Sequence, residues 1–83
     1  MEVKWCYARL RYVRWIKGVA QFQAAYDLGV SRSTYIRYES GVRVPDVVML
    51  AKFCGYFQCT ADYLLGLSSA PGEVRNGGEG GAA

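Results

Sequence analysis

The segment LGVSRSTYIRYESG, residues 28–41, carries the clearest local pattern of the chain. Two glycines bracket it, and the spacing of Val30, Tyr35 and Tyr38 places these three apolar side chains on one stripe of a helix. Most of the other side chains, which include two arginines and several hydroxyl groups, lie off that stripe. We therefore expect a short helix that buries one stripe and offers a polar face to a partner.

Two further helices are predicted before this segment. Residues 3–16 carry Cys6, Leu10 and Val13 at the spacing of one helix face, and Gly18 follows as a residue suited to a helix end. Residues 21–28 form a face of small side chains around alanines, and the glycine after them supplies the backbone conformation that ends a helix. The helix that follows is expected to begin after Ser31, whose hydroxyl is suited to cap it.

The second half of the chain predicts two more helices and a tail. Asp46 and Thr60 are suited to cap the fourth helix and a fifth short helix at 61–67. The residues expected to face inward on the fourth helix are Val47, Leu50, Ala51 and Cys54. Residues 68–83 are rich in Gly and Ala and hold little to bury, which predicts a flexible tail. The chain is therefore expected to be all-α, with one five-helix domain at 1–67.

Composition limits the classes of function. An apolar fraction of 52% contains no run near the roughly 20 residues of a membrane span, because charged or amide side chains interrupt every apolar stretch. The start of the chain lacks the continuous apolar region of a secretory signal, so we expect a cytoplasmic protein without a membrane partner. Three cysteines without any histidine cannot complete a Cys/His zinc site, and we expect reduced thiols, no metal and no cofactor.

An enzyme is the weakest alternative. Cys6, Cys54 or Cys59 could serve as a nucleophile, but the chain has no histidine to act as its base. Apolar neighbours such as Phe53 and Phe57 should raise the pKa of a thiol rather than lower it. We therefore expect no catalytic residues.

The positive charge is concentrated in the predicted domain. Residues 1–67 hold nine Lys and Arg against five Asp and Glu, a net charge of +4, whereas the rest of the chain has a net charge of −1. A basic surface of this size is common among small soluble domains and raises the expectation of a nucleic-acid partner only modestly.

Two short helices joined by a glycine-containing turn have the geometry of a helix-turn-helix. From Leu10 to Gly66 the sequence resembles the Cro and phage-repressor (XRE-type) family of helix-turn-helix DNA-binding domains. The residues that carry the resemblance are Gln21, Ala25, Gly29, the SRST run at 31–34, Tyr38, Glu39, Gly41 and Pro45. The resemblance implies a lambda-repressor-like fold and a sequence-specific transcriptional regulator, expected to be a repressor, that binds double-stranded DNA.

The resemblance also assigns roles to individual residues. It makes the helix after Ser31 the recognition helix, which enters the major groove. The residues expected to contact bases are Arg32, Ser33 and Arg37. The residues expected to contact phosphates are Gln21, Ser31, Ser40 and Arg43. For the arginines the alternative is phosphate contact or solvation, and Ile36 is either a contact to a thymine methyl or an exposed side chain.

Other positions point to the scaffold and to partner proteins. By resemblance, Arg14 and Glu39 form an ion pair that holds the first helix to the third. The large aromatic residues of the first segment, Trp5, Tyr12 and Trp15, either cover the core or form a partner surface. The alternative function is therefore a protein-interaction module of the same fold, such as an antitoxin or the partner of another regulator.

A homodimer on an inverted-repeat operator is the expected assembly, because one recognition helix reads too few base pairs to find a site in a genome. The surface predicted for self-association is the last helix, through Tyr63, Leu64 and Leu67. The alternative is that Leu64 and Leu65 belong to the core.

Overall fold

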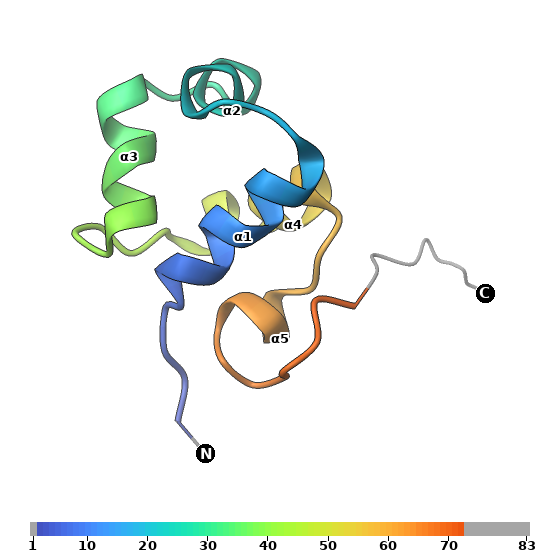
Figure 1. Ribbon diagram of the computed structural model, residues 1–83. Coiled ribbons are helices and arrows are strands. Elements are labelled where there is room, and N and C mark those ends of the chain that lie inside the picture. The colour runs from blue at the N-terminus through green and yellow to red at the C-terminus, as the bar shows by residue number, and fades with distance from the viewer. Residues whose placement is uncertain (1, 73–83) are drawn as a thin grey trace.

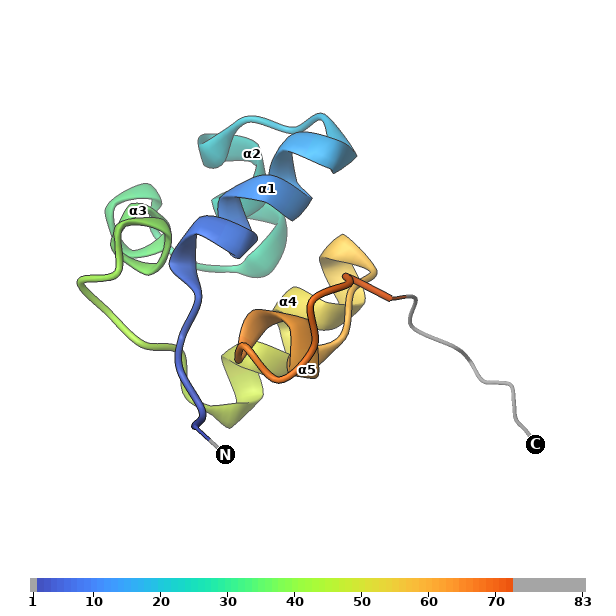
Figure 2. The same cartoon turned by 60° about the horizontal axis from the view of Figure 1, so that its bottom comes forward.

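A computed structural model describes residues 2–72 of the chain, which form five helices and no strand (Figure 1). In chain order the helices are α1 (Tyr7–Lys17), α2 (Gln21–Leu28), α3 (Arg32–Ser40), α4 (Val47–Phe57) and α5 (Ala61–Leu64). The all-α, five-helix fold predicted from the sequence is confirmed. α2 and α3 lie on one side of α1, and α4 and α5 pack on it from another side (Figure 2).

Capping side chains begin three of the helices, and glycines end two of them, at residues that the sequence predicts. Ser31, Asp46 and Thr60 each accept a hydrogen bond from the backbone N–H three residues later, and so cap α3, α4 and α5. Gly29, at φ 79°, ends α2 in the left-handed conformation, and Gly41, at φ 84°, does the same for α3. A side chain at Gly41 would also meet the ring of Tyr7 at 2.7 Å.

The core is built around the ring of Phe53, which is fully buried on α4. Trp5 stacks on this ring with centroids 5.9 Å apart, and Tyr38 meets it edge-on at 5.3 Å. Tyr35 and Phe57 complete the cluster at 6.2 and 6.4 Å. Aromatic rings therefore supply most of the bulk that a domain of this size can bury.

The inward face of α4 differs from the prediction. Val47 is 78% exposed and Ala51 is exposed, while Leu50 and Cys54 are only partly buried. The buried residues of the helix are instead two phenylalanines, so the inward face is shifted by about one residue, or about 100° around the axis. The sequence VVMLAKFCGYF is apolar on almost every side, and the larger rings fill the core better than valine and alanine do.

The first helix begins later than predicted. Residues 2–6 lie outside any helix, and the N–H groups of Lys4 and Cys6 donate to the backbone oxygens of Leu65 and Leu64 at 3.0 and 2.9 Å. The indole N–H of Trp5 donates to the backbone oxygen of Tyr38 at 2.9 Å. The segment before α1 thus lies beside α5 and brings a tryptophan into the core.

Two of the three residues predicted for self-association on the last helix are not available. Tyr63 is 6% exposed and Leu64 is fully buried, so both belong to the core. Leu67 lies beyond the end of α5 and is partly buried. The chain after α5 folds back on the domain, because the Thr60 N–H donates to Pro71 O at 3.0 Å and Arg9 Nη1 donates to Ser68 O at 2.7 Å.

The flexible tail predicted at 68–83 lies from residue 73 onward outside the described residues. Within residues 2–72, no helix has the length and apolar character needed to cross a membrane.

Candidate nucleic-acid interface

The corner between α2 and α3 is built from small and aromatic side chains. Ala24 and Ala25 are buried at 0% and 2% exposure, so α2 brings its backbone close to the rest of the domain. Gly29 makes the turn, and the N–H of Val30 then donates to Ala25 O at 3.0 Å. Tyr35 fills the space inside the corner and is fully buried. The angle between the two helices is therefore set by close packing rather than by a flexible loop.

Opposite its buried stripe, α3 presents a continuous exposed stripe. The buried residues of the helix are Tyr35, Tyr38 and Glu39. The exposed residues on the other side are Arg32, Ser33, Ile36, Arg37 and Ser40. The three side chains predicted to contact DNA bases, Arg32, Ser33 and Arg37, thus share one face. On that face Ile36 lies between Arg32 and Ser40. From the sequence, the role of Ile36 stayed open, because an isolated exposed isoleucine is common on protein surfaces.

The residues that flank this stripe make local hydrogen bonds. Ser31 Oγ donates to Thr34 Oγ1 at 2.9 Å in addition to capping the helix. Ser40 Oγ donates to Arg37 O at 3.2 Å. Arg43 lies just beyond the end of α3, where its guanidinium covers the ring of Tyr38 at 5.6 Å. These contacts hold the hydroxyl groups and the cation at the two ends of the stripe.

Comparison with known proteins agrees with this geometry. Residues 17–64, more than half of the chain, match a family described as helix-turn-helix. The protein belongs to this helix-turn-helix family. It is also similar to the HTH-type transcriptional regulator AnsR of Bacillus subtilis (strain 168), with 49% identity over 39 residues. That match covers 47% of this chain and 34% of the relative, so the chain matches about a third of that protein's length.

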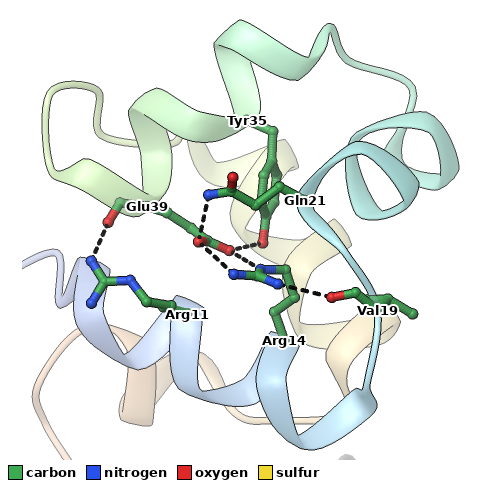
Figure 3. A network of polar contacts seen from close by, with 6 residues as sticks. All are labelled: Arg11, Arg14, Val19, Gln21, Tyr35 and Glu39. Carbon is green, nitrogen blue, oxygen red and sulfur yellow. Dashed lines mark hydrogen bonds and ion pairs between the residues drawn. The ribbon is translucent and has the colours of Figure 1, made fainter.

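A buried carboxylate connects the helix-turn-helix to α1 (Figure 3). Glu39 is 2% exposed, and its Oε2 accepts from Arg14 Nε at 2.6 Å and from the Tyr35 hydroxyl at 2.5 Å. Its Oε1 accepts from Arg14 Nη2 at 3.3 Å and from Gln21 Nε2 at 3.1 Å. Arg14 also donates to Val19 O at 2.9 Å, so the network joins α1, the start of α2 and the end of α3.

The ion pair anticipated from the resemblance is thus part of a larger network. The hydrogen bond to Glu39 raises the pKa of the Arg14 guanidinium, and burial followed by the bond to Glu39 raises the pKa of the Tyr35 hydroxyl. Both shifts favour the protonated donors that a carboxylate needs. Tyr35 and Gln21 were not predicted as partners of Glu39, because their approach depends on the packing of three helices.

The side chain of Gln21 is therefore engaged inside the protein. Its amide nitrogen carries two hydrogens, and donation of one to Glu39 leaves the second for another acceptor. The N-cap residue of α2 is Ala20, whose side chain cannot accept a hydrogen bond from the free backbone N–H groups of the first turn. Both features leave donors at the start of α2.

Residues 2–72 contain all three cysteines of the chain. Cys6, Cys54 and Cys59 are free, and burial raises the pKa of the Cys59 thiol to about 12. Burial also raises the pKa of Cys54. A raised pKa disfavours the reactive thiolate. Within residues 2–72, no group of three or more His, Cys, Asp or Glu side chains is arranged to hold a metal ion.

Proposed function

We propose that the protein is a transcriptional regulator, a repressor, that binds double-stranded DNA with α3 in the major groove. The family and the likeness to an HTH-type transcriptional regulator support DNA binding and regulation. The observation that carries the finer proposal is the exposed stripe of α3, which lies opposite the buried tyrosines and holds two arginines. A polar stripe on a rigidly packed helix is what base recognition requires.

Arg32 and Arg37 are proposed to read bases. An arginine guanidinium can donate two parallel hydrogen bonds to O6 and N7 of guanine, which no other base pair accepts in the same way. Ser33 lies between them as a short donor or acceptor. Ile36, at the centre of the stripe, is suited to contact the methyl group of a thymine.

A second set of residues is proposed to contact phosphates and to set the orientation of the domain. Gln21 would donate its second amide hydrogen, next to the N–H groups of the first turn of α2. Ser31, Ser40 and Arg43 would act at the two ends of the stripe. Because Glu39 holds the amide of Gln21, the same buried network would orient a phosphate contact and the recognition helix together.

Selection of bound sequences from a random DNA duplex pool tests the proposal. The full chain should enrich one motif, and its affinity should fall steeply with salt because neutralised phosphates release counterions. Arg37→Ala should weaken the selected site by about 1–3 kcal/mol and relax preference at one position. Gln21→Ala should weaken selected and random DNA alike, and Lys52→Ala, an exposed cation on α4, is the matched control. Equal losses on both DNAs for Arg37→Ala would refute base reading.

We further propose that two copies bind an inverted repeat and that self-association uses the valine surface, defined as Val42, Val44, Val47 and Val48. These side chains are 61–78% exposed in the loop after α3 and at the start of α4. The patch also holds one cation, Arg43, and one anion, Asp46, so two copies can pair about a two-fold axis without charge repulsion. Its small size supports a weak dimer that forms on DNA.

Variants of the valine surface test the assembly. Val47→Asp, at a valine on α4 that is 78% exposed, should leave the affinity for a single half-site unchanged and abolish cooperative binding to the inverted repeat. Val3→Asp, at an exposed valine before α1, is the matched control. Half-sites should lie about 10 base pairs apart, and insertion of about 5 base pairs should abolish cooperativity. Cooperative binding that survives Val47→Asp would rule out this surface.

A further inference from the structure

We propose that the outer face of α1 is a docking groove for an acidic peptide segment of another protein, one that inserts a large apolar side chain. The α1 groove is a shallow hollow of about 380 Å³ lined by Ala8, Arg11, Tyr12, Arg14 and Trp15. It is separate from the exposed stripe of α3, so the proposal does not depend on DNA binding.

The aromatic residues of the groove have no role in the core. Residues 8, 11, 12 and 15 have the spacing of a single helix stripe, opposite the buried residues Leu10 and Val13. Trp15 is 72% exposed, and its ring lies 6.3 Å from the half-exposed ring of Tyr12. Trp5, in contrast, is 8% exposed and fills the core. An exposed pair of large rings on the outer face of a helix is typical of an interaction surface.

The shape of the groove follows from the sequence of α1. Ala8 is small and leaves a hollow one helical turn before Tyr12 and Arg11. The guanidinium of Arg14 is turned toward Glu39, which leaves the stem of its side chain as part of the groove (Figure 3). Trp, Tyr and Arg around a hollow are the residues that contribute most to binding energy at protein interfaces.

Charge identifies the chemistry of the partner. α1 carries Arg9, Arg11, Arg14 and Lys17 and no acidic residue. Within residues 2–72, the one ion pair is Arg14 with Glu39, so the charge of Arg11 is not neutralised by a carboxylate. The side chain of Arg11 donates instead to a backbone oxygen, that of Glu39 at 3.2 Å.

An acidic peptide is therefore favoured over two other occupants. A second copy of the chain would place Arg11 near its own equivalent across a two-fold axis, where like charges repel. A single-stranded nucleic acid needs several cations along its backbone, and the groove offers one cation without a carboxylate partner. In a peptide, a carboxylate can pair with Arg11 while a neighbouring apolar side chain packs on the rings of Tyr12 and Trp15.

Selection from a phage-displayed library tests the proposal. Random peptides of about 12 residues, enough for about three helical turns, are selected on the full chain and the enriched peptides are synthesised. We expect Asp or Glu next to Phe, Trp or Leu in the enriched sequences. Their affinity should fall roughly tenfold or more on Trp15→Ala, as expected for an anchoring aromatic residue. Selection on Arg11→Glu should instead enrich basic peptides.

Matched variants keep the test informative. Tyr26→Ala removes an aromatic ring that is 81% exposed on α2, outside the groove, and should leave peptide affinity unchanged. Tyr12→Ala is a second groove variant, and the three alanine variants of Tyr12, Trp15 and Tyr26 should unfold close to the thermal midpoint of the parent. Failure to enrich any peptide, enriched peptides without acidic residues, or equal binding to Trp15→Ala would each overturn the proposal. So would a single-stranded oligonucleotide that binds the parent and not Trp15→Ala while no peptide does.

Discussion

Arg14→Ala should strongly destabilise the domain, because it removes the cation from a buried carboxylate. Glu39 is 2% exposed and would keep only the donors from Tyr35 and Gln21. Breaking a buried ion pair by removing one partner costs about 3–5 kcal/mol. Since the side chain of Arg14 is 18% exposed, we expect the lower end, about 3 kcal/mol.

This loss is large for a small domain. A free energy of unfolding of roughly 0.05–0.15 kcal/mol per residue implies about 4–12 kcal/mol in total, so the variant would lose a quarter or more of it. The unfolding midpoint should fall by about 12–24 °C, at about 4–8 °C per kcal/mol. Urea denaturation near neutral pH, followed by circular dichroism and by tryptophan fluorescence, to which the buried Trp5 contributes, measures the change.

Two further variants separate the ion pair from the other contacts of α1. Arg11→Ala removes a hydrogen bond to a backbone oxygen and should cost no more than about 1 kcal/mol. A double-mutant cycle with Arg14→Ala and Glu39→Gln should give a coupling energy of about 1–3 kcal/mol. The reasoning is wrong if the free energy of unfolding of Arg14→Ala lies within about 1 kcal/mol of that of the parent, as expected for Arg11→Ala. It is also wrong if the double-mutant cycle gives no coupling.

Three other perturbations test the fold. Gly29→Ala should lower the free energy of unfolding by about 1–2 kcal/mol through the strain of a positive φ alone, because a Cβ there meets nothing within 4 Å. Gly55→Ala, inside α4 and equally free of contacts, should instead be stabilising, and equal effects of the two changes would contradict this. Trp5→Phe should cost about 1–2 kcal/mol in urea denaturation, because it leaves the buried oxygen of Tyr38 without its donor, and an unchanged midpoint would mean that water replaces the bond. Burial raises the pKa of the Cys59 thiol from 9.0 to about 12, so the folded state binds this proton more tightly than the unfolded state does. The free energy of unfolding should therefore be unaffected by this group below pH 9 and should fall as the pH rises toward 12. Cys59→Ala should flatten this alkaline decline, measured as unfolding free energy against pH.

Much of the helix-turn-helix could be predicted from the sequence because its signals are local. A capping hydroxyl at Ser31 and a glycine at position 29 act within one helical turn, so their effect depends little on the rest of the chain. The buried stripe of α3 follows from spacing alone, and with it the opposite exposed stripe. The roles of Arg32 and Arg37 in base contact stay predictions.

The network around Glu39 was predictable only in part. A pair of opposite charges at Arg14 and Glu39 follows from the resemblance to a known family. The additional donors, Tyr35 and Gln21, reach the carboxylate because α1, α2 and α3 meet at one point. No spacing within a single helix encodes that meeting.

The sequence by itself determined the helices, their caps, the stripe of α3 and the basic character of the domain. Tertiary structure alone decided three features: the inward face of α4, the burial of Trp5 and the withdrawal of Tyr63 and Leu64 into the core. The physical reason is the same in each case. These segments hold more apolar side chains than one face can bury, and the choice among them depends on which volume the other helices leave open.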